Sequence, residues 1–239
     1  MGLSREEVAR IAATQDWHYE HDLGDGIVTR TVLPDHQAWH DLRKRILSDV
    51  IAAKYGGSLS GLNCLDIACN SGFWSFFLAD LGARSVTGFD VAKRIEQARF
   101  VQQCRGRDGS YANVGFTVDD VATFDYGADR YDLIFCLGIF YHLTDVVGFA
   151  RNLHRSAKQR VIVDTSVSDL EGAVLELSDH TKYRCCDSEE FALVPTREAC
   201  RRIFAHVGFR GILDWYPSDE PGRDSYNPRS PRAIYVLEK

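Results

Sequence analysis

The sequence predicts an α/β protein with a seven-stranded, mostly parallel sheet, an antiparallel last strand and an N-terminal helical cap. Residues 63 to 69 form an apolar run of the kind that is buried on both faces of a parallel sheet. This run ends in the turn-forming residues Asn70, Ser71 and Gly72, and an apolar segment of helical length, residues 73 to 81, follows. The alternation of strand and helix repeats along the chain, which is typical of a parallel sheet covered by helices.

Length and composition are those of one folded domain with a modest extension. The chain has 239 residues, of which 45% are hydrophobic and 26% charged. Its net charge of −6 gives no bulk attraction to nucleic acid or to an anionic membrane. No apolar stretch reaches the roughly 18 residues of a membrane span, and residues 1 to 15 lack the apolar core of a signal peptide. We therefore expect a cytoplasmic protein.

The seven cysteines predict free thiols and no metal site. They are odd in number and scattered over predicted strands and helices, which favours reduced thiols over a disulfide framework. Cys185 and Cys186 are the only adjacent pair, and the sequence nearby has no further ligands at the spacing of a zinc site.

Residues 1 to 57 are predicted to form a helical cap that is too small for an independent domain. Ser4 and Glu7 have the spacing of a capping box at the start of a first helix. Residues 36 to 55 carry apolar side chains at helical spacing, and two glycines follow them. The segment between these helices, residues 17 to 29, is aromatic and polar.

The rest of the chain supplies the remaining elements of the sheet and its helices. Residues 168 to 194 are an excursion without clean periodicity, and residues 217 to 232 are a polar loop rich in proline, glycine and serine. Such loops carry the specificity of many α/β proteins. Further strands are predicted at residues 85 to 90, 114 to 120, 131 to 139, 160 to 167, 210 to 216 and 233 to 238, and further helices at residues 91 to 104, 145 to 156 and 196 to 208.

Acidic residues follow three predicted strands. Asp66 lies near the end of the first strand, Asp90 ends the second, and Asp119 and Asp120 end the third. Because ligands of parallel sheets bind at the carboxyl ends of the strands, these side chains are expected in one crevice. A carboxylate at such a position accepts hydrogen bonds from both hydroxyls of a ribose, so the pattern predicts a nucleotide-type ligand.

Residues 66 to 72, DIACNSG, resemble motif I of the class I S-adenosylmethionine-dependent methyltransferases, D/E-x-G-x-G-x-G. Ala68 and Asn70 stand in place of two of its glycines. The resemblance implies a Rossmann-like methyltransferase domain over residues 58 to 239, with S-adenosyl-L-methionine as cofactor and S-adenosyl-L-homocysteine as product. It implies that Asp90 binds the ribose and that Asp120, or Asp119 as its rival, binds the adenine amino group. The residues expected around the cofactor are Asp66, Ala68, Cys69, Asn70, Gly72, Phe73, Trp74, Asp90, Val91, Asp119, Asp120, Val121, Leu137, Trp17 and Thr29.

Residues 138 to 143, GIFYHL, resemble the G-(V/I)-L-Y-H-(L/R) signature of the tRNA wobble-uridine carboxymethyl-transferase group and of related small-molecule methyltransferases. Residues 17 to 29 are similar to the W-Y-H-x-I-x-L-x-D-G-V-x-T segment of that group, and residues 193 to 196 and 230 to 233 are similar to two further segments. The chain has no counterpart of the group's W-R-K-G-P-F stretch or of its long N-terminal domain. We therefore expect ordinary S-adenosylmethionine as the donor.

Methyl transfer from a sulfonium is an in-line displacement, and it requires a general base only if the nucleophile arrives protonated. His142 is the candidate base, with a histidine bonded to a backbone carbonyl as the alternative. Tyr141 is a candidate for direct contact with the reacting groups, or else a wall of the pocket, and His180 is expected to reach the same pocket from the excursion. Tyr19, Tyr141 and Arg232 are the candidate substrate-binding residues, and Arg232 suits an anionic group unless it is a solvated loop residue.

The sequence thus predicts a methyltransferase that acts on an oxygen or nitrogen of a small molecule, such as a natural-product intermediate. A tRNA-modifying transferase and a non-catalytic cofactor-binding protein are the alternatives. The expected partner is a small-molecule acceptor rather than nucleic acid or a membrane, and the protein is expected to be a monomer or a homodimer. The identity of the acceptor and of the methylated atom stays open.

Overall fold

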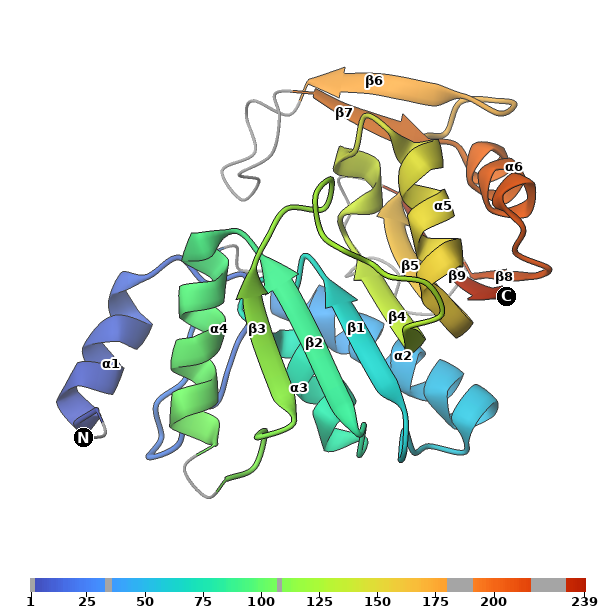
Figure 1. The fold of residues 1–239 in the computed structure, drawn as a ribbon. Helices are drawn as coiled ribbons and strands as arrows, with labels where there is room; N and C mark the ends of the chain where they lie inside the picture. Colours follow the sequence, from blue (N-terminus) through green and yellow to red (C-terminus); the bar gives the residue numbers. More distant parts are fainter. Residues whose placement is uncertain (1–2, 33–35, 107–108, 180–190, 216–230) are drawn as a thin grey trace. The chain divides into compact units, whose positions relative to one another are not determined.

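A computed structural model describes residues 3–32, 36–106, 109–179, 191–215 and 231–239 (Figure 1). The helices are α1 (Arg5–Thr14), α2 (His36–Tyr55), α3 (Phe73–Asp80), α4 (Ala92–Arg105), α5 (Val146–Ser156) and α6 (Arg197–Val207), with a short 3₁₀ helix η1 (Phe140–His142). The strands are β1 (Asn63–Ile67), β2 (Ser85–Asp90), β3 (Val114–Val118), β4 (Tyr131–Leu137), β5 (Ala157–Ser166), β6 (Leu175–Asp179), β7 (Phe191–Pro195), β8 (Gly211–Trp215) and β9 (Arg232–Glu238).

The main sheet has seven strands in the order β3-β2-β1-β4-β5-β9-β8. β1 pairs with β4, β2 with β3, and β4 with β5, each time in parallel. β9 is antiparallel to both of its neighbours, β5 and β8. The predicted fold class, a mostly parallel seven-stranded sheet whose last strand is antiparallel, is confirmed.

Strands β6 and β7 form a separate two-stranded antiparallel sheet within the excursion at residues 168 to 194. The sequence pattern did not resolve this sheet. β6 places Leu175 and Leu177 on one face, but both side chains are exposed, so burial contributed little to the pattern.

The chain divides into two compact units. The first comprises residues 1 to 61 and 69 to 120, and the second comprises residues 62 to 68 and 121 to 239. The first unit therefore contains the N-terminal helices with β2, β3, α3 and α4, and the second contains the remaining strands with α5 and α6.

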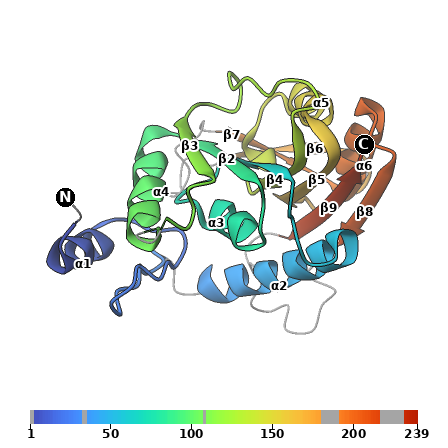
Figure 2. The same cartoon turned by 60° about the horizontal axis from the view of Figure 1, so that its bottom comes forward.

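In the first unit, the N-terminal helices form as the sequence predicts. Helix α1 begins with the expected capping box, in which the Glu7 amide donates to Ser4 Oγ and the Ser4 amide donates to a Glu7 carboxylate oxygen. Helix α2 runs beside α3 (Figure 2), and its Arg43 guanidinium lies 5.2 Å from the ring centroid of Trp74. Arg43 is 1% exposed, so the α2–α3 contact buries an aromatic face against a cation.

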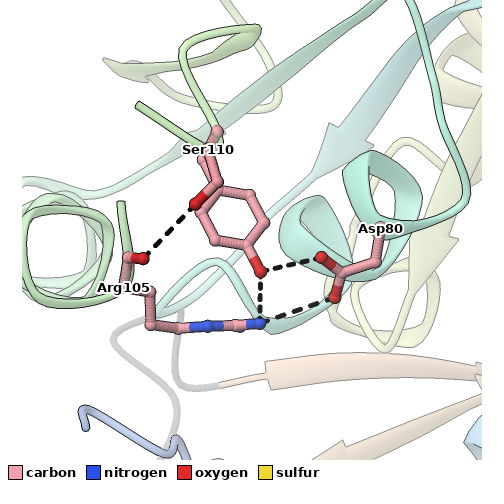
Figure 3. A network of polar contacts seen from close by, with 4 residues as sticks. Asp80, Arg105 and Ser110 are labelled. Carbon is pink, nitrogen blue, oxygen red and sulfur yellow. Dashed lines mark hydrogen bonds and ion pairs between the residues drawn. The ribbon is translucent and has the colours of Figure 1, made fainter. Parts of the chain in front are cut away.

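A polar network joins the ends of α3 and α4 in the same unit (Figure 3). The Tyr111 hydroxyl donates to Asp80 Oδ1 at 2.7 Å, and Arg105 Nη2 donates to the Tyr111 hydroxyl at 2.5 Å. Arg105 also lies over the ring of Phe76, 5.0 Å from its centroid. The network fixes the guanidinium charge of Arg105 beside α3.

The second unit buries β4 and β9 almost completely, and it buries β5 from Val161 onward. Helix α6 is capped at its start by Thr196, whose hydroxyl accepts from the Ala199 amide, and at its end by Gly208 with φ of 112°, as predicted. Burial raises the pKa of Cys64 and of Cys200 to about 12, so both thiols are protonated at neutral pH and poor nucleophiles.

The described residues contain neither a membrane-spanning helix nor a metal-binding cluster. None of the helices in this part of the chain has the length and hydropathy of a membrane span. The same residues contain no cluster of three or more histidine, cysteine or acidic side chains that could bind a metal ion.

Candidate functional site

The turn between β1 and α3, residues 68 to 72, has positive φ at three residues, and only one of them is glycine. Ala68 has φ of 53° and Asn70 has φ of 50°, and Gly72 has φ of 82°. A left-handed backbone is rare for residues with a Cβ atom, although asparagine tolerates it better than alanine. Positions 68 and 70 are those where motif I has glycine. The turn therefore has a left-handed backbone at both of these positions and carries the strain of two side chains.

Two glycines let this turn pack closely on its neighbours in the first unit. A Cβ atom on Gly72 would lie 2.7 Å from Cζ of Phe116, and one on Gly88 would lie 2.9 Å from Ser75 Oγ and 3.0 Å from Cys69 Sγ. Such distances require atoms to shift, so larger residues are disfavoured at both positions. Gly88 is a close-packing position that the sequence reasoning did not single out.

Asp90, at the end of β2, is held in place by two backbone amides. Its Oδ2 accepts from the Asn70 amide at 2.7 Å, and its Oδ1 accepts from the Val91 amide at 2.7 Å. A carboxylate has about four acceptor positions, so both oxygens keep capacity for further donors. The motif turn is therefore tied directly to the Asp90 side chain, and binding of ribose hydroxyls by this carboxylate stays a prediction.

Asp119 and Asp120 follow β3 next to Asp90 in the same unit. The Asp119 amide donates to the Asp90 carbonyl at 3.1 Å, and Asp119 Oδ1 accepts from the Asp120 amide at 2.8 Å. Asp119 is half-buried and Asp120 is exposed. The assignment of one of them to the adenine amino group stays a prediction, with Asp120 favoured by the sequence.

The N-terminal segment, residues 16 to 31, binds to α3 and α4. The Tyr19 ring stacks on Phe73 with centroids 4.8 Å apart, and its hydroxyl accepts from Trp74 Nε1 at 3.1 Å. At the start of the segment, the Asp16 carbonyl accepts from Arg94 and from Gln97. The segment is thus attached at both the first turn of α3 and the surface of α4.

Trp17 and Thr29 use their polar groups inside this part of the unit. Trp17 Nε1 donates to the Ala12 carbonyl at 3.0 Å, and its side chain is 1% exposed. The Thr29 hydroxyl donates to the Tyr19 carbonyl at 3.0 Å and accepts from the His21 amide at 2.8 Å. These contacts shape the segment, and a direct contact of either residue with the cofactor stays a prediction.

His21 joins the segment to the motif turn, which the sequence reasoning missed. Its Nε2 lies 2.8 Å from Ser71 Oγ, and the two side chains are 2% and 0% exposed. Burial, together with the positive charge of Arg105, lowers the pKa of His21 to about 3. His21 is therefore neutral near pH 7. The sequence offered one signal for this contact, a histidine within residues 17 to 29, a segment with other residues assigned to the walls of the pocket.

In the second unit, the turn after β4 carries the Tyr-His pair. Gly138 has φ of 106°, and its amide donates to the Asp164 carbonyl at 2.8 Å. Tyr141 and His142 lie in η1 with ring centroids 4.0 Å apart. His142 is 9% exposed, and its amide donates to the Ile139 carbonyl. The structure thus places two of the three candidate catalytic residues together on one short helix.

Arg232 lies beside this pair and is buried. Its Nε donates to Asp164 Oδ1 at 2.9 Å and its Nη1 donates to Ser166 Oγ at 3.1 Å. Its guanidinium carbon lies 5.3 Å from the ring centroid of Tyr141. With 2% exposure, Arg232 is not a solvated loop residue. The sequence reasoning missed its partner Asp164, a charged residue inside an apolar strand.

The remaining predicted residues fall in different places. Asp66 is 1% exposed in β1, opposite Phe135 of β4, and Leu137 is 7% exposed at the end of β4. Val91 is the exposed N-cap of α4, and Val121 directly follows Asp120. His180 lies outside the described residues. The structure therefore gathers the predicted residues into two groups, one around the motif turn and Asp90 and one around η1.

The chain is similar to a known protein family and to several curated proteins. Residues 35–213 match a family model described as a methyltransferase domain. A tRNA U34 carboxymethyltransferase from Nautilia profundicola is 26% identical over 162 residues, which is 66% of this chain and 47% of that protein. The protein of the same name from Campylobacter hominis is 35% identical over 114 residues, 46% of this chain and 38% of that protein. The matches thus span less than half of these relatives.

Solved structures with the same fold cover nearly the whole chain. The N-terminal domain of EvdMO1, crystallised with S-adenosylhomocysteine and D-fucose, has a TM-score of 0.73 at 17% identity and covers 100% of this chain and 97% of that one. The magnesium protoporphyrin IX methyltransferase of Synechocystis, with bound S-adenosylhomocysteine, has a TM-score of 0.61 at 22% identity and covers 90% of each chain. At these identities the likeness establishes the fold.

Proposed function

The chain belongs to the methyltransferase domain family, and on that premise we propose that it transfers a methyl group from S-adenosylmethionine to an oxygen or nitrogen of a small-molecule acceptor. The observation that carries the proposal is the motif turn. Its left-handed residues and its hydrogen bond to Asp90 at the end of β2 support a site for a nucleotide-type donor there. The cofactor is S-adenosylmethionine, and the product is S-adenosylhomocysteine.

The residues around the motif turn fit this donor. Asp90 has acceptor capacity on both oxygens for the ribose hydroxyls, and Asp119 or Asp120 is the acceptor for the adenine amino group. Because Gly72 has no side chain, the backbone of the turn approaches Phe116 closely at that point. Bound S-adenosylmethionine supplies an electrophilic methyl group on a sulfonium, and the protein's task is to hold the acceptor in line with it.

His142 is the group that takes the acceptor's proton. A hydroxyl gives up its proton as its oxygen attacks the methyl group, and a protonated amine must lose a proton before its nitrogen can attack. A neutral imidazole is a suitable base for either step near neutral pH. The neighbouring Tyr141 ring, in contact with Arg232, supports the position of η1. Tyr141 and Arg232, which lie close together in the second unit, are the proposed acceptor-binding residues there, and Tyr19 of the first unit stays a candidate from the sequence. His180 lies outside the described residues.

Binding of the donor is the direct test of this proposal. Isothermal titration calorimetry with S-adenosylmethionine and S-adenosylhomocysteine is expected to give saturable binding, and adenosine without the amino-acid part serves as the control ligand. Absence of binding at about millimolar ligand would contradict the proposal. A dissociation constant of about 1 mM corresponds to a binding free energy of about −4 kcal/mol. Formation of S-adenosylhomocysteine in the presence of candidate acceptors then separates an enzyme from a non-catalytic cofactor-binding protein.

The similarity to tRNA U34 carboxymethyltransferases favours tRNA as a second candidate acceptor. The net charge of −6 favours a small molecule instead, because phosphate contacts require a surplus of basic groups. The two acceptors are distinguished by adding tRNA to the protein at increasing salt. A tRNA substrate predicts affinity that falls steeply with salt through counterion release, whereas a small-molecule enzyme predicts no specific tRNA binding.

A further inference from the structure

We propose that His21 is a positioning residue for donor binding: its hydrogen bond to Ser71 holds the strained motif turn in the conformation that receives the donor. This inference rests on the proposed function for its ligand. The bond itself and its effect on the turn are properties of the ligand-free protein, so they can be measured separately.

The contact is well suited to transmit position. His21 Nε2 and Ser71 Oγ are 2.8 Å apart, and both side chains are buried, so water does not compete for the bond. The imidazole is packed between the rings of Trp17, Phe73 and Phe76, with centroids 5.9 to 6.4 Å away. A ring held on several sides cannot follow Ser71 if the turn moves, so the turn is restrained instead.

Ser71 stands in the middle of the strained stretch. Ala68 and Asn70 have positive φ on its N-terminal side, and Gly72 has positive φ directly after it. Residues in this region of backbone space persist only when the surrounding structure holds them there. In motif I glycine meets this requirement by itself, whereas alanine needs contacts from outside the turn. The bond from His21 is such a contact.

The bond also reaches the ribose-binding carboxylate through a short chain of contacts. The Ser71 amide donates to Asn70 Oδ1 at 2.8 Å, and the Asn70 amide donates to Asp90 Oδ2 at 2.7 Å. A shift of Ser71 therefore displaces the Asn70 amide, whose hydrogen bond orients the Asp90 carboxylate. By this route His21 affects the donor site without touching the donor.

The state of His21 suits a fixed contact rather than a switch. The imidazole is neutral near pH 7, and its Nδ1 atom is buried with no hydrogen-bond partner within the part of the chain that the structure describes. An unsatisfied buried polar atom is unfavourable for stability. The fold alone therefore gains little from histidine here, and a leucine of similar size would fill the same space.

The test measures stability and donor affinity in the same variants. His21→Leu is expected to weaken S-adenosylhomocysteine binding about tenfold by calorimetry, the usual effect of losing one buried hydrogen bond. Ser71→Ala is expected to have the same effect, and the double variant is expected to be no weaker than either single one. His21→Gln, which keeps a side-chain amide near the position of Nε2, is expected to recover part of the affinity. Val8→Ala, a buried change in α1, is the control that lowers stability and leaves affinity unchanged.

Relief of the backbone strain provides the decisive arm. In an Ala68→Gly background the turn holds its own conformation, so His21→Leu is expected to weaken binding less than twofold there. An undiminished tenfold loss in that background, or unchanged affinity in the single His21→Leu variant, would overturn the inference.

The failure of the inference differs from the failure of the proposed function. If the wild-type chain binds no donor, the proposed function fails, and hydrogen exchange of the ligand-free protein still tests the role of His21. His21→Leu is then expected to speed exchange of the Asn70 and Ser71 amides at least tenfold, with no change in β4. Equal protection of these amides in both proteins would overturn the inference.

Discussion

Two turns that follow buried strands carry predicted site residues, and they are held in contrasting ways. The turn after β1 has alanine and asparagine at positive φ and is restrained by hydrogen bonds, among them His21 to Ser71 and the Asn70 amide to Asp90. The turn after β4 starts with a true glycine, Gly138, and lies beside a buried ion pair between Asp164 and Arg232. The first turn stores strain in its backbone, whereas the second depends on paired charges. Substitutions are therefore expected to affect the two turns through different terms and by different amounts.

The largest effect is expected where the ion pair is broken on one side. Asp164 and Arg232 have side chains that are 0% and 1% exposed, so Asp164→Asn removes the negative charge of a buried ion pair. We expect a loss of about 3–5 kcal/mol in the free energy of unfolding, measured by urea denaturation. The double variant Asp164→Leu with Arg232→Met, which removes both charges, is expected to recover most of this loss. A cost below about 1 kcal/mol for the single variant would show that the pair is not what holds the second turn.

The next effect concerns turnover and belongs to the second turn. His142→Ala is expected to lower turnover roughly 10²-fold or more and to leave the affinity for S-adenosylhomocysteine nearly unchanged, because a positioned base contributes to the chemical step. Rates at saturating donor and acceptor provide the measurement. His142→Gln is the matched control, since it keeps hydrogen bonding without basicity. Full turnover in either variant would make His142 a structural residue of η1.

The corresponding change at the first turn is expected to act on binding. Asp90→Ala removes the acceptor for the ribose hydroxyls and for the Asn70 and Val91 amides, so donor affinity is expected to fall about 10- to 100-fold. Calorimetry with S-adenosylhomocysteine measures the loss. Asp90→Asn keeps one acceptor oxygen, so its donor affinity is expected to lie between those of the wild type and of Asp90→Ala. If affinity stays within twofold of wild type, the ribose is bound elsewhere and the comparison between the turns loses its functional meaning.

Acid sharpens the contrast, because burial beside the first turn lowers the pKa of His21. The pKa of His21 is lowered from its ordinary value near 6.5 to about 3 by burial and by Arg105. The unfolded chain therefore binds a proton at this side chain that the folded protein does not, and stability falls as pH drops from about 6.5 towards 3. The slope for one such group is about 1.4 kcal/mol per pH unit. His21→Leu is expected to flatten the pH dependence of the melting temperature over this range. Equal slopes for the two proteins would mean that His21 is protonated in the folded state.

Much of the fold was predictable from local sequence signals. Helix α2 and strand β2 match their predicted bounds at both ends, and helix α6 begins and ends at the predicted cap residues. These signals act over a few residues, through apolar periodicity, capping side chains and glycine at positive φ. The contacts that hold the two turns were not predictable in this way. His21 and Ser71 are 50 residues apart, and Asp164 and Arg232 are 68 apart, and no local pattern connects them. The positive φ of Ala68 is likewise invisible in the sequence, except as an alanine where motif I has glycine.

The smallest predicted effect tests that strain directly. Ala68→Gly removes a Cβ atom from a residue with φ of 53°, a conformation that disfavours alanine by about 1 kcal/mol or more. Glycine loses more conformational entropy on folding, which offsets part of this gain. We therefore expect the free energy of unfolding to rise by at most about 1 kcal/mol in urea denaturation, with donor affinity unchanged or slightly higher. The matched change Ala83→Gly, at a buried alanine that does not have positive φ, is expected to lower stability instead. A loss of stability at both positions would mean that the first turn is not strained, and the difference between the two turns would then lie only in their charges.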